Sequence, residues 1–278
     1  MDASTKIVRP KALGFEFEVL ADDAIIGPAI ERGSWADHET YLFRAHVRPG
    51  MKVVDLGANI GWFAVQGVLA GAEVHAFEPV PAIADVCERN LRRAEAHGGG
   101  RGILHRVAAS DHAGRATILL AAKNHGDNRV VEGGEKPRDL AGAEEISIEL
   151  ARVDERVQGP VGFLKIGTQG SEFLALQGAR ELLAASPRLA MLMEFWPPYA
   201  LRGAKPEQLL EFLFQQGFTI GKATEAPYPM SAARILKQTL ARDPVRGGID
   251  LYLTRGVPFH VESPKNRLRA FVRSLKEP

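Results

Sequence analysis

The chain has 278 residues, of which 45% are hydrophobic and 25% charged, as in an ordinary globular protein, and the length fits one large α/β domain with extensions. A net charge of +1 gives no electrostatic basis for binding nucleic acid or an acidic membrane surface. The single cysteine, Cys87, excludes an internal disulfide, and without a signal peptide or a membrane-length apolar run we expect a cytoplasmic protein.

The first predicted helix lies near the N-terminus. Apolar residues recur at helical spacing from Ala29 to Val47, with a candidate cap at Ser34 and a stop at Pro49-Gly50. Residues 1–50 therefore form a helical extension before the first clear strand.

A strand, a glycine turn and a helix follow, and then a second strand that ends in a carboxylate. We predict strand Lys52–Leu56, helix Trp62–Ala70 and strand Glu73–Phe77, which leads into Glu78. This is the layout of a nucleotide-binding α/β half-domain, in which the ligand lies at the carboxyl ends of parallel strands.

The glycine pattern between these elements indicates the kind of nucleotide. It runs Asp-x-Gly-x-x-x-Gly from Asp55, and Asn59 stands where a dinucleotide fingerprint has the glycine that clears space for pyrophosphate. S-adenosylmethionine has no pyrophosphate, its ammonium group can be attracted by Asp55, and its ribose hydroxyls can donate to Glu78. The alternative is that the glycines only make a tight turn and that both acids are solvated strand ends.

The next elements include an insertion. We predict helix Pro81–Ala96 and strand Ile103–Ala108, and then two segments of strand character, Arg115–Ala121 and Glu145–Arg152. The polar segment Lys123–Gly142 between them predicts a hairpin with a long loop at its tip, and such loops are often lids or binding loops.

Regular alternation of strands and helices then resumes. The pattern predicts two strand–helix units and two closing antiparallel strands: Val161–Ile166, Glu172–Ala184, Leu189–Phe195, Pro206–Gly217, Phe218–Lys222 and Gly248–Thr254. The tail, residues 256–278, is basic and has a short amphipathic helix pattern over Asn266–Leu275, which we interpret as a solvated or docked helix.

Three separated motifs resemble one known family. Asp55–Gly61, Phe77–Pro79 and Phe163–Glu172 look like the motifs of FkbM-type class I methyltransferases, and the resemblance extends from about Gly50 to about Arg255. It implies an α/β fold with a seven-stranded, mostly parallel, doubly wound (Rossmann-like) sheet in a methyltransferase domain over residues 51–255, with the inserted β-hairpin. It also implies that residues 1–50 are a lid over the cofactor, and that S-adenosylmethionine gives its methyl group to a hydroxyl of a sugar or polyketide.

The motifs place the cofactor on a defined set of residues. Ser110 and Asp111 follow the third strand, where methyltransferases commonly contact adenine, although Asp111-His112-Ala113-Gly114 is equally a turn sequence. The complete set that we expect to bind S-adenosylmethionine is Asp55, Gly57, Ala58, Asn59, Gly61, Glu78, Ser110 and Asp111.

The candidate catalytic residues are Glu194, His125 and Asp127. Glu194 ends an otherwise apolar strand, where a carboxylate is unfavourable unless it is paired or useful, and the family pattern also has a glutamate there. A structural hydrogen bond is the competing explanation. His125 and Asp127 lie in the inserted loop, in a hexapeptide that resembles a motif of a family subset, and a histidine there can act as a base near neutral pH. The alternative for His125 is an exposed loop position.

Gly167 departs from the family pattern, which usually has aspartate directly after Lys-Ile. The missing carboxylate disfavours a metal-dependent mechanism, and we expect no metal. We predict an O-methyltransferase for a small polyhydroxylated acceptor, with no nucleic-acid or membrane partner, and the oligomeric state stays open. The alternatives are a cofactor-binding pseudoenzyme with a regulatory or assembly role, motivated by Gly167, and a nicotinamide-dependent oxidoreductase, which Asn59 disfavours.

Overall fold

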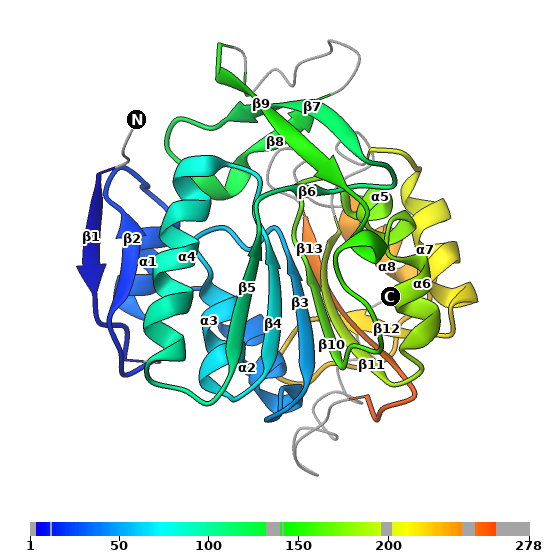
Figure 1. Ribbon diagram of the computed structural model, residues 1–278. Coiled ribbons are helices and arrows are strands. Elements are labelled where there is room, and N and C mark those ends of the chain that lie inside the picture. Colours follow the sequence, from blue (N-terminus) through cyan, green and yellow to red (C-terminus); the bar gives the residue numbers. More distant parts are fainter. Residues whose placement is uncertain are drawn as a thin grey trace.

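A seven-stranded sheet forms the centre of the computed structural model, which describes residues 4–11, 13–131, 140, 142–195, 202–240 and 248–259 (Figure 1). The strand order is β12-β13-β11-β10-β3-β4-β5, and only β13 runs antiparallel to its neighbours. The sheet is therefore mostly parallel, as expected. Its strands are β3 Lys52–Leu56, β4 Glu73–Phe77, β5 Arg101–His105, β10 Phe163–Ile166, β11 Leu189–Phe195, β12 Thr219–Lys222 and β13 Ile249–Arg255.

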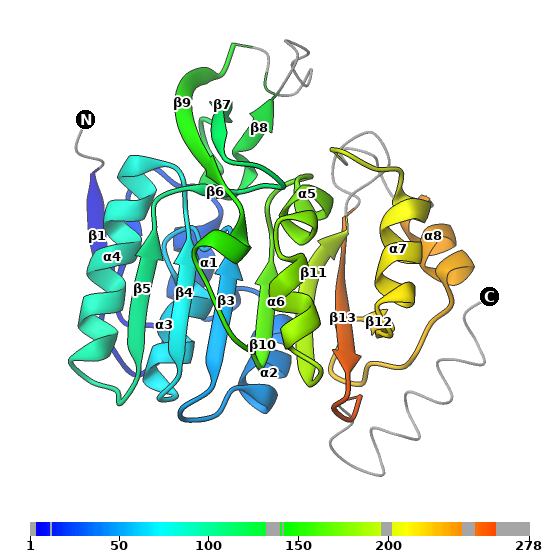
Figure 2. The same ribbon diagram turned by 45° about the vertical axis from the view of Figure 1, so that its right-hand side comes forward.

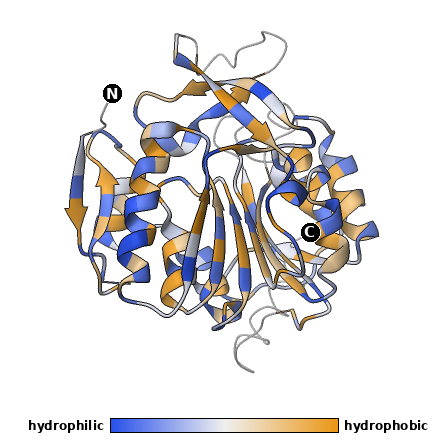
Figure 3. Ribbon diagram, viewed as in Figure 1, coloured by the Kyte–Doolittle hydropathy of each residue, from blue (hydrophilic) through white to orange (hydrophobic). Residues whose placement is uncertain are grey.

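Helices cover both faces of this sheet. Alternate strand residues such as Val53 and Val54 belong to two separate apolar cores, because successive side chains of a strand point to opposite faces. Hydrophobic residues accordingly follow the central strands in Figure 3. One core includes α2 Asp37–His46, α3 Trp62–Leu69 and α4 Pro81–Glu95; the other includes α5 Glu172–Gln177, α6 Arg180–Ala185, α7 Pro206–Gln215 and α8 Ala232–Leu240.

The N-terminal segment differs from the single helix that the sequence predicted. Two helices, α1 Ile26–Arg32 and α2, are separated because Gly33 ends α1 in the left-handed region at φ +73°. An unexpected antiparallel hairpin, β1 Thr5–Val8 and β2 Phe17–Leu20, precedes them. Residues 1–50 thus contain more strand structure than apolar periodicity indicates.

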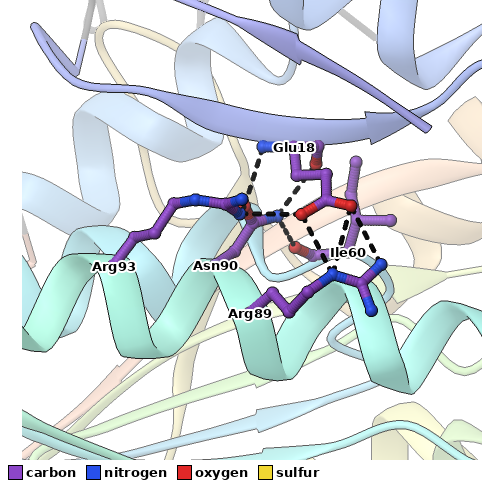
Figure 4. Close-up of polar contacts among 5 residues, drawn as sticks. All are labelled: Glu18, Ile60, Arg89, Asn90 and Arg93. Carbon is purple, nitrogen blue, oxygen red and sulfur yellow. Dashed lines mark hydrogen bonds and ion pairs between the residues drawn. The ribbon is translucent and has the colours of Figure 1, made fainter.

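A buried ionic and amide network attaches this hairpin to α4 (Figure 4). The Glu18 carboxylate, 4% exposed, accepts hydrogen bonds from Arg89 and Arg93, which hold the pKa of Glu18 at about 2 despite its burial. Asn90 Nδ2 donates to the backbone oxygens of Glu18 and Ile60, each at 2.9 Å. One helix face therefore contacts both the hairpin and the turn after β3.

The insertion is a separate four-stranded sheet rather than a simple hairpin. Its strand order is β6-β9-β7-β8, and the predicted loop contains a 3₁₀ turn, His125–Asp127, followed by β8 Arg129–Val131. β7 is Gly114–Leu120 and β9 is Glu144–Ala151, while β6 Ala108–Ala109 separates from the predicted third strand. Figure 2 shows this sheet above the carboxyl ends of the central strands.

One predicted helix is divided into two in the structure, at a close backbone contact. The single predicted helix from Glu172 to Ala184 is interrupted at Gly178, where a Cβ would overlap the backbone oxygen of Ser110. Helix α8 was not predicted, and the predicted helix Asn266–Leu275 lies outside the described residues. Within the described part of the chain, no helix has the length and apolarity needed to cross a bilayer.

Candidate active site

A cavity of about 680 Å³ lies at the carboxyl ends of β3, β4, β10 and β11, beneath the inserted sheet. Its volume is in the range of small-molecule sites. The cavity is lined by residues from the strand ends, the N-terminal segment and the insertion, and many of them are polar or aromatic. The lining includes Trp35, Glu39, Gly57, Ala58, Asn59, Phe63, Glu78, Ser110, His125, Asp127, Lys165, Gly167, Gln169, Glu194, Arg202 and Asp250.

The turn after β3 shapes one wall of the cavity. Gly57 has φ +76°, and a Cβ on it would overlap the carbonyl oxygen of Gly167 at the end of β10. The backbone N–H groups of Gly57 and Ala58 both donate to Phe77 O at the end of β4. The backbones at the ends of β3, β4 and β10 are thereby in direct contact, and only glycine fits at position 57.

Glu78 directly follows β4 and is 6% exposed. Its Oε2 accepts from Asn59 N at 3.0 Å and its Oε1 accepts from Val80 N at 2.9 Å. Burial raises the pKa of Glu78 to about 7, against these two hydrogen bonds. The carboxylate is therefore fixed in orientation at the cavity wall, and each oxygen keeps lone-pair capacity for a ligand hydroxyl.

The structure divides the eight predicted cofactor residues into two groups. Gly57, Ala58, Asn59, Glu78 and Ser110 line the cavity, whereas Asp55, Gly61 and Asp111 do not.

Each of the three residues outside the cavity wall has another contact. Asp55, 1% exposed, lies 3.9 Å from Lys165 Nζ, because the two residues are register partners on β3 and β10. Burial raises the pKa of Asp55 and the Lys165 charge opposes that rise. Gly61 faces Cys87 on α4, and Asp111 accepts a hydrogen bond from Ser110.

At the other end of the cavity, Glu194 and Lys165 meet beside Gly167. Glu194 Oε2 accepts from Gln169 Nε2 at 2.6 Å, and Lys165 Nζ donates to Gly57 O at 3.3 Å. A Cβ at position 167 would overlap Lys165 Nζ and lie 2.7 Å from Glu194 Oε1. The space that an aspartate would need is thus occupied by the ends of the Lys165 and Glu194 side chains.

Sequence reasoning missed two carboxyl groups at this end, Glu39 on α2 and Asp250 on β13. Asp250 is the register partner of Glu194 on the adjacent strand. Burial and the neighbouring carboxylates of Glu194 and Glu39 raise the pKa of Asp250 well above its usual range, and burial also raises the pKa of Glu39. Asp250 interrupts an apolar strand in the same way as Glu194, a signal that could have identified it; Glu39 gave no such signal.

Glu172 supports the loop between β10 and α5 without lining the cavity. This residue is fully buried, and its Oε1 accepts from the backbone N–H groups of Thr168 and Gly170 at 3.0 and 3.1 Å. Burial and the Glu194 charge raise the pKa of Glu172 to about 7. The buried carboxylate therefore holds the loop that carries Gln169.

The two predicted catalytic residues of the insertion line the cavity but have partners of their own. Asp127 Oδ1 accepts from Arg129 Nη2 at 2.8 Å, and His125 Nε2 lies 3.2 Å from Asp22 Oδ1. Over the residues that the structure describes, no group of three or more histidine, cysteine, aspartate and glutamate side chains is placed to hold a metal ion.

Comparison with known proteins gives one family. Residues 55–220 match the family described as Methyltransferase FkbM domain. The methyltransferase sdnD of Sordaria araneosa is 29% identical over 195 residues, which cover 60% of this chain and 73% of that protein.

Solved structures with a similar arrangement include the magnesium protoporphyrin IX methyltransferase of Synechocystis PCC 6803 with bound SAM, at 12% identity, a TM-score of 0.47, and coverage of 84% of this chain and 85% of that one. A putative rRNA-methylase from Clostridium thermocellum has 11% identity, a TM-score of 0.46, and coverage of 80% and 96%.

Proposed function

Because this chain belongs to the FkbM methyltransferase family, we propose that it is an O-methyltransferase for a hydroxyl of a small polyhydroxylated acceptor, either a sugar moiety or a natural-product scaffold. S-adenosylmethionine is the methyl donor that goes with this family. The observation that supports a hydroxyl acceptor is the position of Glu194, a carboxylate that lines the far end of the cavity and is oriented by Gln169.

The two ends of the cavity suit the two substrates. Glu78 accepts the ribose hydroxyls of the donor, and Ser110 lies on the adenine side. Gly57 and Ala58 allow the donor to approach the backbone closely. The remaining space reaches Glu194 and the insertion, where the acceptor binds against His125 and Asp127.

Methyl transfer is a direct displacement. S-adenosylmethionine, held by Glu78 and the turn after β3, would supply an electrophilic methyl group, with the electron pair of the broken carbon–sulfur bond remaining on the sulfur of S-adenosylhomocysteine. The hydroxyl proton passes to the Glu194 carboxylate, acting as general base. Asp250 suits this role less well, because burial and the neighbouring carboxylates of Glu194 and Glu39 raise its pKa and favour its neutral form. Alignment of oxygen, methyl and sulfur by the cavity walls supplies much of the acceleration, on the order of 7–11 kcal/mol for well-oriented reactants.

The test is the release of S-adenosylhomocysteine with a panel of free sugars, glycosides and hydroxylated macrolactones. With an accepted compound, Glu194→Gln should lower kcat/KM roughly 10²–10⁴-fold, the usual contribution of a general base. Its affinity for S-adenosylhomocysteine should not change. The matched control is Glu181→Gln on α6, whose side chain is 80% exposed and outside the cavity wall.

Each other outcome has a distinct meaning. Equal turnover in Glu194→Gln would exclude Glu194 as the base. If the protein binds S-adenosylhomocysteine but methylates no compound of the panel, the O-methyltransferase proposal fails. The alternative prompted by Gly167, a cofactor-binding protein without turnover, then takes its place.

A further inference from the structure

Three segments that are far apart in the sequence meet at Asn59. Its backbone N–H donates to Glu78 Oε2 at 3.0 Å, and its Nδ2 donates to the carbonyl oxygen of His125 in the insertion, also at 3.0 Å. Its Oδ1 accepts from Ile60 N at 2.8 Å, so the orientation of the amide follows the backbone of this turn. One residue thus contacts both the proposed ribose-binding carboxylate and the inserted loop.

The N-terminal segment holds the same loop from its other side. Asp23 Oδ2 accepts from His125 N at 2.9 Å, while Asp23 Oδ1 accepts from Ile25 N at 2.8 Å at the start of α1. Ala24 N donates to Lys123 O at 2.9 Å. The backbone of His125 is therefore held between Asn59, through its carbonyl oxygen, and Asp23, through its N–H.

The backbone at position 59 restricts which residue can do this. Asn59 has φ +51°, in the left-handed region that asparagine, aspartate and glycine occupy more readily than other residues. Glycine has no side chain to reach His125 O, and aspartate offers only acceptors to a carbonyl oxygen. Of these three residues, asparagine alone combines this conformation with a side-chain donor.

We propose that Asn59 is a positioning residue that couples donor binding to the placement of the inserted loop over the cavity. The inference rests on the proposed position of the ribose at Glu78. A donor on Glu78 fixes the turn, the fixed turn orients the Asn59 amide, and the amide holds His125 over the cavity. By linkage, a held loop strengthens donor binding by the same factor.

A double-mutant cycle on the full chain tests this coupling, with S-adenosylhomocysteine affinity measured by calorimetry. Asn59→Gly keeps the backbone conformation and removes the amide. Asp23→Asn keeps one acceptor oxygen for α1 and presents an amide to His125 N. Each change should weaken affinity about 5–20-fold, in the usual range of coupling between sites. The double variant should bind no more weakly than Asn59→Gly, because the loop is already uncoupled.

The other outcomes overturn the inference. Fully additive losses would show that Asn59 and Asp23 act independently, and unchanged affinity in Asn59→Gly would show that the amide does not support donor binding. Thermal unfolding of each variant checks that the fold is retained. Glu78→Gln separates the two proposals: if this variant binds S-adenosylhomocysteine normally, the ribose position is wrong. No acceptor is needed, so the result does not depend on the O-methyltransferase proposal.

Discussion

The raised pKa of Glu78 predicts that donor affinity depends on pH. The carboxyl group titrates at about 7, and ribose hydroxyls donate only to its ionised form with full strength. About one tenth of Glu78 is ionised at pH 6 and about nine tenths at pH 8. Apparent affinity scales with the competent fraction, so the Kd for S-adenosylhomocysteine should fall about tenfold between these pH values. Binding near pH 6 should release close to one proton.

Glu78→Gln should remove this dependence. The variant keeps the side-chain shape but loses a charge-assisted hydrogen bond, worth about 1.5–3 kcal/mol, so affinity at pH 8 should fall by roughly one to two orders of magnitude. At pH 6 the difference from the natural chain should shrink. The measurement is titration calorimetry from pH 6 to 8 in buffers of different ionisation enthalpy, which counts the protons released.

Glu172→Gln is the matched control, because Glu172 is also buried with a pKa of about 7 but lies outside the cavity wall. The pH dependence of binding should persist in this variant. A pH-independent affinity in the natural chain would refute the reasoning, and so would a dependence that survives in Glu78→Gln.

Three further predictions follow from the site. Gly167→Asp should lower turnover about tenfold or more, because the ends of Lys165 and of the proposed base Glu194 must move to admit the new side chain, and misplacing a catalytic group lowers the rate. It should gain nothing from magnesium, and a magnesium-dependent gain would contradict this prediction. Replacing His125–Arg129 by a short glycine linker should abolish acceptor turnover. It should weaken S-adenosylhomocysteine binding only as much as Asn59→Gly does, and normal methylation by this variant would contradict the prediction. The pKa of Glu172 is raised from 4.5 to about 7 on folding, so the folded state binds more protons and its stability should fall as pH rises through this window. Thermal unfolding of Glu172→Gln should show a smaller loss of stability over the same pH range, and an equal loss in both proteins would contradict the raised pKa.

The buried parallel strands were the most predictable part of the chain. Strands β3, β4 and β11 have the predicted bounds, because most of their residues are apolar and glycine or proline lies close to both ends of each strand. The hairpin β1–β2 was missed because Glu18 reads as an exposed residue. Its burial depends on arginines of α4, more than 70 positions away.

The candidate site was predictable where strand ends supply it and unpredictable where tertiary contacts do. Glu78 and Glu194 follow from their place at the ends of apolar strands. Glu39 reaches the cavity only because α2 packs over the sheet, and its proximity to Asp250 depends on the antiparallel register of β13. The cofactor contact predicted for Asp55 follows from the glycine motif, whereas its neighbour Lys165 follows only from strand register.

A side chain at position 57 would overlap the carbonyl oxygen of Gly167. The close contact between the ends of β3 and β10 therefore requires glycine there, whether or not a nucleotide binds. A related protein that no longer binds a methyl donor would still need this glycine if it had the same sheet. The glycine is thus evidence for the fold and not for ligand binding. Glu78 is better evidence that the cavity binds a ligand. This buried carboxylate destabilises the folded state near neutral pH, so a protein that binds no ligand there would become more stable if Glu78 were replaced.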